Sequence, residues 1–233
     1  MTSKIFKITG LVFLLNSGSA FSGTMETQSA SYHNAKENFY FGVGLGSAFD
    51  THYFSILNTN SGASVQINSS HSHALVNLLA GYGFTAYNRF YLGGELGTNF
   101  PRRTTNFNRQ GVSPTSPIVT NYLSLQDYVT GDVLPGFRFN NFLIYGRLGL
   151  AYSHLGFYQD ATMTTPIFED SSNQLSERLG LGINYAVTPS FSLSVDYTYM
   201  DYQAWDIFFP RVPVVSKSKP CTNYVGLSLI YSF

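Results

Sequence analysis

The sequence is poor in charged residues, has one cysteine, and has no long hydrophobic run after residue 20. Only 11% of the 233 residues are charged, against roughly 25% in an average soluble domain, so a surface facing water on all sides is not expected. The formal net charge of zero leaves no basic surface for a nucleic acid. A single cysteine, Cys221, excludes an intramolecular disulfide and a cysteine-based zinc cluster.

The residues that are abundant point to a membrane protein built from strands. Hydrophobic residues make up 44% of the chain, aromatic residues make up 16%, and the 21 glycines lie mostly within apolar segments. No segment after residue 20 approaches the roughly 18 consecutive apolar residues of a spanning helix. Because every backbone polar group in lipid must be hydrogen-bonded internally, a closed β-barrel is the remaining way to cross a membrane.

The N-terminal residues have the pattern of a secretory signal peptide. Lys4 and Lys7 precede an apolar run that ends at Leu15, and small residues follow as far as Ala20. Cleavage after Ala20 and cleavage after Ser22 fit equally well. We assign three segments: a signal peptide at 1–22, a short polar periplasmic leader at 23–38, and one barrel domain at 39–233.

From Phe39 onward, apolar residues alternate with small or polar residues in eight segments bounded by turn residues. This alternation is typical of strands with one apolar face, and each segment is close to the roughly 9 to 11 residues that a tilted strand needs to cross a bilayer. The predicted fold class is all-β, an eight-stranded antiparallel up-and-down outer-membrane barrel. The predicted strands are 39–49, 73–84, 89–99, 127–139, 142–154, 175–187, 191–203 and 221–233.

The connections between these strands alternate in length. Three are short and are predicted to be periplasmic turns: 85–88, 140–141 and 188–190. Four are long and polar and are predicted to be extracellular loops: 50–72, 100–126, 155–174 and 204–220. This alternation of short turns and long loops is the arrangement of outer-membrane barrels.

Residue parity assigns the two faces of each strand. In the last strand Val225, Leu227 and Leu229 should face lipid while Gly226 and Ser228 face inward, and a one-residue slip would move charges into lipid. Two aromatic girdles are expected. The one at the turn ends comprises Phe84, Phe90, Phe139, Phe142, Phe191 and Tyr231, and the one near the loop ends comprises Tyr152, Tyr199, Tyr202 and Trp205.

Parity also places five charged residues inside the barrel at comparable depth. An eight-stranded barrel is only wide enough for side chains to fill it, so these charges must be paired or hydrated. We favour a stabilising polar core over a gated conductance path. The predicted interior network comprises Glu95, Asp132, Arg147, Arg178 and Asp196.

The predicted loops carry an uneven charge. The third loop holds Asp160, Glu169 and Asp170. The second and fourth loops hold the members of a candidate basic patch: Arg102, Arg103, Arg109, Arg211, Lys217 and Lys219. Such a patch could clamp lipopolysaccharide phosphates or an anionic host surface, or it could simply be solvated, and the sequence leaves both readings open.

No catalytic or metal site is assigned. His154 and Glu177 have outward parity near the loop end of one hairpin and could be neighbours, but Ser153 and Ser176 have inward parity, so a nucleophile is missing. His71 and His73 could bind a metal only with a third ligand such as His52, and histidines at a loop edge are more often solvent-exposed. We expect no metal and no cofactor.

Residues of the last predicted strand resemble a known sequence signal. Tyr224, Gly226, Leu229, Tyr231 and Phe233 resemble the terminal signal that the barrel-assembly machinery reads. Over 39–233 the chain resembles the small eight-stranded outer-membrane β-barrel superfamily, which includes the OmpA transmembrane domain, OmpX and the opacity-type proteins. The OmpA-like proteins continue into a peptidoglycan-binding domain, whereas this sequence ends at Phe233, so anchoring through such a domain is not expected.

The resemblance implies a Gram-negative outer-membrane protein. Its expected partners are outer-membrane lipid and lipopolysaccharide, the assembly machinery during insertion, and a host or surface ligand; we expect a monomer. The predicted function is a non-enzymatic barrel that stabilises the envelope and displays extracellular loops for adhesion or host interaction. The alternatives are a lipid A deacylase or acyltransferase and a narrow low-conductance pore, the latter disfavoured by the strand number.

Overall fold

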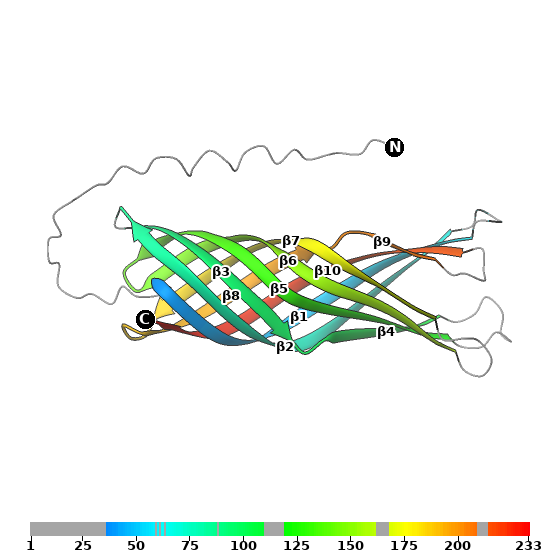
Figure 1. The fold of residues 1–233 in the computed structure, drawn as a ribbon, viewed down its shortest axis with the longest axis horizontal. Helices are drawn as coiled ribbons and strands as arrows, with labels where there is room; N and C mark the ends of the chain where they lie inside the picture. Colours follow the sequence, from blue (N-terminus) through cyan, green and yellow to red (C-terminus); the bar gives the residue numbers. More distant parts are fainter. Residues whose placement is uncertain are drawn as a thin grey trace. The chain divides into compact units, whose positions relative to one another are not determined.

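The described residues of the computed structural model form ten antiparallel strands (Figure 1). The described residues are 36–58, 60, 62, 64–87, 89–109, 119–161, 168–208 and 214–233. The predicted signal peptide and most of the predicted leader lie outside them. Within these ranges, no helix has the length and hydropathy needed to cross a membrane.

The strands are long, and most of them exceed the predicted spans. Their bounds are β1 Asn38–Asn58, β2 Ser64–Ala86, β3 Phe90–Phe100, β4 Arg103–Arg109, β5 Val119–Phe139, β6 Phe142–Ala161, β7 Phe168–Ala186, β8 Phe191–Asp201, β9 Trp205–Phe208 and β10 Val214–Ser232.

Eight of the ten strands close into a ring. The order of hydrogen-bonded neighbours is β1-β2-β3-β5-β6-β7-β8-β10, and β10 pairs back onto β1. The closing ladder runs from Tyr40 opposite Ser232 to Asn58 opposite Val214. The predicted eight-stranded antiparallel barrel is therefore confirmed, and the ring has no open edge at this level.

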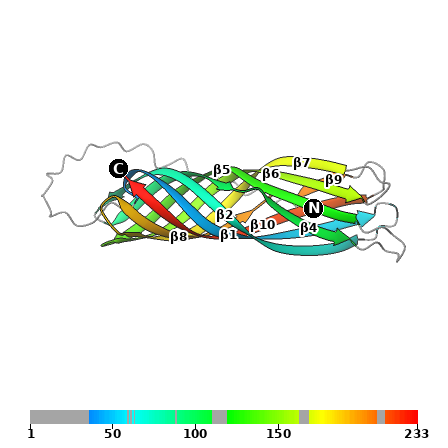
Figure 2. The same ribbon diagram turned by 90° about the horizontal axis from the view of Figure 1, so that it is seen from below.

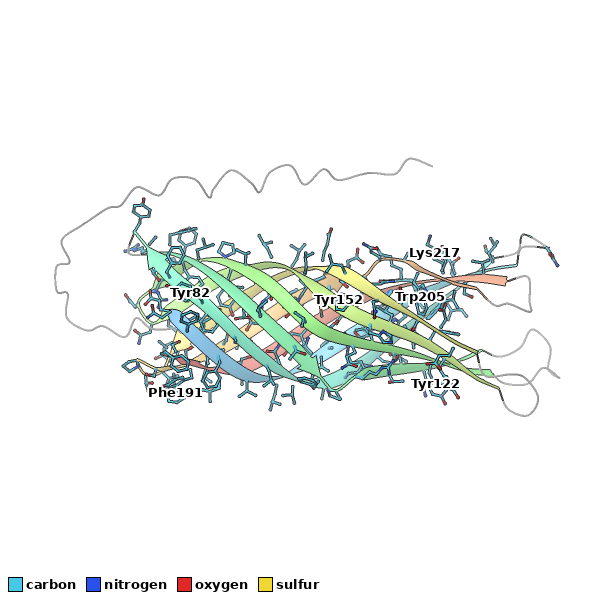
Figure 3. All side chains as sticks on the ribbon, in the orientation of Figure 1. Tyr82, Tyr122, Tyr152, Phe191, Trp205 and Lys217 are labelled. Atoms are coloured by element: carbon cyan, nitrogen blue, oxygen red, sulfur yellow. The ribbon has the colours of Figure 1, made fainter. Side chains whose placement is uncertain are left out.

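The predicted alternation of faces is confirmed. Burial alternates residue by residue along β8, and the outward residues include Leu45, Leu181 and Leu227, which expose 69%, 67% and 53% of their surface. In a membrane these side chains face lipid. We call the surface they form the lipid-facing band. Figure 3 shows Tyr82 and Phe191 at one end of the barrel and Tyr152 farther along it.

One predicted girdle is correct and the other is only partly so. At the turn ends Phe84, Phe139, Phe142 and Phe191 are exposed, and the Phe191 ring packs edge-on against Tyr231 at 5.1 Å. At the other end Tyr152 and Tyr199 face outward, but Tyr202 and Trp205 are buried inside. Tyr202 has the inward parity of β8, and the break in the strand at 202–204 shifts the inward parity of β9 to odd residues.

The predicted extracellular loops are mostly strand. Beyond the lipid-facing band the strands continue in a segment that we call the outer extension: 50–58, 64–75, 103–109, 119–127, 153–161, 168–176, 205–208 and 214–220. Its outward residues are mostly polar, so the sequence pattern that marks lipid contact ends before the strands do. Its inward residues remain apolar in several strands, which sustains the alternation.

The ring separates into two sheets in the outer extension. Pairing of β2 with β3 ends at Val76 opposite Phe100, and β4 then pairs with β5 alone. Pairing of β7 with β8 ends at Glu177 opposite Asp201, and β9 pairs with β10 alone. In the part of the chain that the structure describes, the extension therefore consists of the sheets β4-β5-β6-β7 and β9-β10-β1-β2 (Figure 1, Figure 2).

The outer extension has its own apolar core. The side chains of this core come from both sheets and are nearly inaccessible; they include Phe54, Leu123, Leu125, Leu155, Phe157 and Ile207. Two four-stranded sheets that pack face to face around such a core form a small sandwich. The extension is therefore a framework of packed strands rather than a set of solvated loops.

Candidate functional site

The five predicted interior charges meet inside the ring. The Arg147 guanidinium lies at the centre: Nη1 is 2.7 Å from Glu95 Oε1 and also contacts Asp132, and Nη2 is 3.1 Å from Asp196 Oδ1. Arg178 Nη1 lies 2.8 Å from Asp132 Oδ2. All five side chains are buried. These contacts link β3, β5, β6, β7 and β8 across the lumen.

Lys36 is a sixth member of this network and was not predicted from the sequence. Lys36 belongs to the segment predicted as a leader, yet it is fully buried, with Nζ 2.7 Å from Glu95 Oε2 and 3.1 Å from Tyr145 Oη. The ammonium also lies 4.6 Å from the centre of the Tyr145 ring. The predicted network held three acids and two arginines, and this imbalance was the one signal that a further cation was needed.

Little space remains in the lumen at this level. A cavity of about 10 Å³ lies beside Arg147, Arg178 and Tyr224, which is about the size of one water molecule. Buried atoms without a protein partner line this region, among them Arg147 Nε, Arg178 Nε and Tyr224 Oη. One bound water could satisfy some of them, so the polar core fills this level of the ring.

Arg103 belongs to a second interior cluster, at the base of the outer extension. Its guanidinium lies 3.3 Å from Asp50 Oδ1 and 3.0 Å from Asp127 Oδ2. Asp127 also accepts hydrogen bonds from Ser153 and Tyr202. The prediction that Arg103 belongs to a loop patch is wrong, because 103–109 is a strand, β4, that continues the inward odd parity of β3.

The three histidines considered for a metal site lie near this cluster. His73 Nε2 is 3.8 Å from Asp50 Oδ2, and His71 Nδ1 is 3.3 Å from Ser69 Oγ. His52 is buried, and burial together with the nearby Arg103 lowers the pKa of its imidazole to about 3. Among the described residues, no three histidine, cysteine or acidic side chains gather in a metal-binding group.

The remaining basic residues do not form one surface. Lys217 and Lys219 are exposed on β10, 3.9 Å from Asp206 and 3.0 Å from Asp201 respectively. Arg102 lies on the other sheet, just before β4. Arg211 and the side chain of Arg109 fall outside the described residues. The single basic patch predicted from the sequence is therefore divided between two sheets and the barrel interior.

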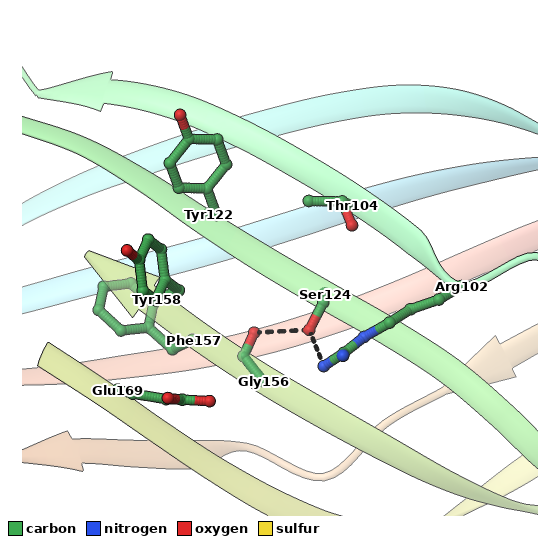
Figure 4. A pocket seen from close by; sticks show the side chains of 8 residues that line it. All are labelled: Arg102, Thr104, Tyr122, Ser124, Gly156, Phe157, Tyr158 and Glu169. Atoms are coloured by element: carbon green, nitrogen blue, oxygen red, sulfur yellow. Dashed lines mark hydrogen bonds between the residues drawn. The ribbon is translucent and has the colours of Figure 1, made fainter. Parts of the chain in front are cut away.

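Arg102 lines a groove of about 420 Å³ on the outer face of the sheet β4-β5-β6-β7 (Figure 4). Arg102 Nη2 donates to Ser124 Oγ at 2.6 Å, and Ser124 donates to the carbonyl of Gly156 at 3.3 Å. The other lining residues are Thr104, Tyr122, Phe157, Tyr158 and Glu169. We call this feature the outer groove. It was not predicted from the sequence, because all of its lining residues lie in the two predicted loops 100–126 and 155–174, whose pairing into one sheet was not foreseen.

Two tyrosines form one wall of the outer groove. The rings of Tyr122 and Tyr158 lie 5.9 Å apart, tilted by 47°, and come from paired positions on β5 and β6. Glu169 lies opposite Tyr158 on β7. Neither Arg102 nor Glu169 forms an ion pair with any described residue.

His154 lies on the same face of this sheet as the outer groove, but not beside Glu177. Its Nδ1 is 2.8 Å from Asn173 Oδ1, and its register partner is Asn173, whereas Glu177 pairs with Leu150. Four strand positions separate His154 from the level of Glu177, or roughly 13 Å. The expectation that the two could be neighbours is wrong, because the register of β6 and β7 was unknown from sequence.

The proposed assembly residues occupy both faces of β10. Tyr224 and Gly226 are buried in the lumen, whereas Leu229 faces outward. The rings of Tyr231 and Phe233 pack edge-on with centres 5.1 Å apart. Recognition of these residues by the assembly machinery stays a prediction.

Solved structures of outer-membrane proteins are similar to this chain at low sequence identity. OprG from Pseudomonas aeruginosa is 16% identical, with 86% of this chain and 99% of OprG covered and a TM-score of 0.54. The protease OmpT from Escherichia coli is 9% identical, with coverages of 85% and 97% and a TM-score of 0.53. The attachment invasion locus protein Ail of Yersinia pestis is 17% identical, with coverages of 83% and 99% and a TM-score of 0.40.

At such identities the likeness to OprG and OmpT concerns the fold alone. No curated protein sequence matches this chain. The sequence does match the family described as the outer membrane protein beta-barrel domain, over residues 17–233. The closed ring, its lipid-facing band and this match agree, and the chain belongs to the outer membrane protein beta-barrel family as an integral protein of the bacterial outer membrane.

Proposed function

We propose that this protein is a non-enzymatic barrel that stabilises the outer membrane and presents its outer extension for attachment to a surface or to host molecules. The observation that carries the proposal is the extension itself, two sheets packed on an apolar core beyond the lipid-facing band. Recognition residues on a rigid frame lose little conformational entropy on binding. The extension is such a frame.

The partners follow from the same arrangement. Outer-membrane lipid and lipopolysaccharide would surround the lipid-facing band, the barrel-assembly machinery would insert the chain, and a surface or host ligand would meet the extension. We propose that the barrel acts as a monomer, since its ring is closed by pairing of β1 with β10 within one chain.

Adherence of cells tests this function. A non-adherent Gram-negative strain that expresses the full chain should bind cultured epithelial cells or glass more than the same strain with an empty vector. A matched control strain expresses Leu155→Asp, which places a charge in the core of the outer extension. This variant should adhere less than the wild type. A normal heat-dependent gel shift must show that its ring still folds. Equal adherence of the wild-type strain and the empty-vector strain would refute the proposal.

A lipid A assay tests the non-enzymatic part of the proposal. Lipid A incubated with refolded protein should keep its mass, beside a His154→Ala sample as control. A change of one acyl chain that is absent in the His154→Ala sample would overturn the proposal and make His154 catalytic.

A further inference from the structure

We infer that the outer groove binds a saccharide that carries an anionic substituent such as a carboxylate or a phosphate. This inference deepens the proposed function and rests on it, since it names the chemistry by which the extension would attach. Four features of the groove support it: the floor, the residues across its face, the two charges that have no ion pair among the described residues, and the height above the lipid-facing band.

The floor of the outer groove depends on Gly156. A Cβ atom at this position would lie 2.7 Å from Ser124 Oγ and 2.9 Å from Arg102 Nη2, closer than carbon normally approaches either atom. The glycine therefore lets the Arg102 side chain lie flat across β5 and β6, where Ser124 holds it at 2.6 Å. The guanidinium is positioned before any ligand arrives.

The strand register arranges outward residues in two rows that cross the groove, and Asn106 and Ser171 extend these rows just beyond its lining. One row runs Thr104, Ser124, Gly156 and Ser171, and the next runs Asn106, Tyr122, Tyr158 and Glu169. The rows combine hydroxyl, amide and carboxylate groups with two aromatic rings. This combination suits a sugar, because its hydroxyls need donors and acceptors while its C–H faces pack against aromatic rings.

The charges of the groove define the ligand further. Arg102 has five N–H donors, and only its bond to Ser124 is formed among the described residues. A guanidinium without an acidic partner fits a carboxylate or phosphate with two parallel hydrogen bonds. Glu169, at the other end of the groove, would accept hydrogen bonds from sugar hydroxyls.

The height of the groove sets where the saccharide can come from. His154 and Gly156 follow Tyr152, the outward aromatic residue at the edge of the lipid-facing band, by two and four positions on β6. The groove thus begins roughly 7 to 14 Å beyond that edge. The sugar of an outer-leaflet glycolipid and a glycan on another surface both reach this level, and they share the chemistry named above.

Binding to refolded full-length protein tests the inference. The probes are 3′-sialyllactose, lactose, and nanodiscs with purified lipopolysaccharide or with phosphatidylglycerol alone. The variants are Arg102→Gln and Tyr158→Ala, and Lys217→Gln on the opposite sheet is the matched exposed control. All proteins must show the gel shift of a folded barrel.

We expect binding of 3′-sialyllactose, of lipopolysaccharide nanodiscs, or of both, in preference to lactose and phosphatidylglycerol. Arg102→Gln should weaken binding about tenfold or more, since a hydrogen bond to a charged group contributes roughly 1.5 to 3 kcal/mol. Tyr158→Ala should weaken it several-fold, and Lys217→Gln should not change it. The probe that binds identifies the source of the sugar.

Two results would overturn the inference: no binding of either anionic probe, or equal binding by wild type and Arg102→Gln. Failure of this inference can be distinguished from failure of the proposed function by the adherence assay. Adherence that persists in the Arg102→Gln and Tyr158→Ala strains but disappears in the Leu155→Asp strain would retain attachment by the extension and exclude the outer groove as its site.

Discussion

At the scale of single residues, Arg147 is the central cation of the ion network in the lumen. Its guanidinium contacts Glu95, Asp132 and Asp196. In Arg147→Met the cationic partners that these acids retain in the described part of the chain would be Arg178 and Lys36. Removal of one partner from a buried ion network typically costs 3 to 5 kcal/mol, and we expect a loss of about that size in the free energy of unfolding.

Urea unfolding in lipid vesicles, followed by the heat-dependent gel shift, measures this loss. Arg89→Met is the control, because Arg89 lies exposed at a turn. Arg147→Met with Asp196→Asn should recover part of the loss, because Arg178 still pairs with Asp132 and Lys36 with Glu95, whereas Asp196 has no other ion pair among the described residues. An unfolding free energy within about 0.5 kcal/mol of wild type, the usual range for surface changes, would contradict a structural role.

Lys36 makes a second prediction at this scale. Lys36→Met removes the cation that lies 2.7 Å from Glu95 Oε2 while retaining side-chain length. We expect a loss of unfolding free energy of a few kcal/mol, by the same argument as for Arg147, in the same urea assay. A neutral result would show that the turn at Lys36 does not contribute to the lumen network.

At the scale of elements, the separation of the ring into two sheets leaves strand edges in the outer extension. In the described residues, 64–75 of β2 pair with β1 but not with β4, and 168–176 of β7 pair with β6 but not with β9. Unpaired edge amides exchange faster than paired ones.

Hydrogen exchange followed by mass spectrometry measures this difference. Peptides from 64–75 and 168–176 should exchange faster than peptides from 76–86 and 177–186 of the same two strands. Peptides from the outer part of β5, which has partners on both sides, serve as the control. Uniform protection along β2 and β7 would mean that the two edges are paired.

The extension also has a predictable dependence on pH. Burial, with Arg103, His71 and His73 nearby, lowers the pKa of His52 from 6.5 to about 3. Below pH 6.5 the unfolded chain therefore binds a proton that the folded chain does not, so the free energy of unfolding falls as the pH falls from 6.5 toward 3. The difference between pH 7 and pH 5 should be at most about 2 kcal/mol.

The single tryptophan reports on this element, because Trp205 lies in the extension core. Urea unfolding followed by Trp205 fluorescence at pH 7 and pH 5 should show the loss in the wild type and a smaller loss in His52→Gln. Titration of other groups is common to both proteins and cancels in the comparison. The same pH dependence in both proteins would show that His52 is not the group responsible.

At the scale of the whole molecule, the interior is occupied by side chains of different chemistry at different levels. The ion network occupies the ring, with a cavity of about 10 Å³ beside it, and the apolar core occupies the extension. We expect no stable conductance steps in a planar bilayer, with a porin reconstituted in parallel as the positive control. Reproducible steps from the wild-type protein would restore the pore as a function.

Much of the fold followed from local pattern, and the candidate site did not. The alternation around Val225 and Leu227 predicted the lipid-facing side of β10, because lipid requires apolar side chains at every second position. Arg103 lies in a polar stretch predicted as a loop, to which no parity was applied. Tyr202 lies within the predicted strand 191–203 and has its inward parity, but it was assigned to the outer girdle as an aromatic residue near the loop end. Lys36 precedes the alternation, so only the charge imbalance of the predicted network pointed toward it.

The sequence by itself determined the class, the eight crossings of the membrane and the five inward charges of the predicted network, because each depends on a period of two along a single strand. Tertiary structure decided which side chains meet across strands. The register of β6 with β7 separates His154 from Glu177, and the pairing of β4 with β5 assembles the outer groove around Gly156. Register is a relation between distant segments, set by hydrogen bonding and core packing, and no period within one segment contains it.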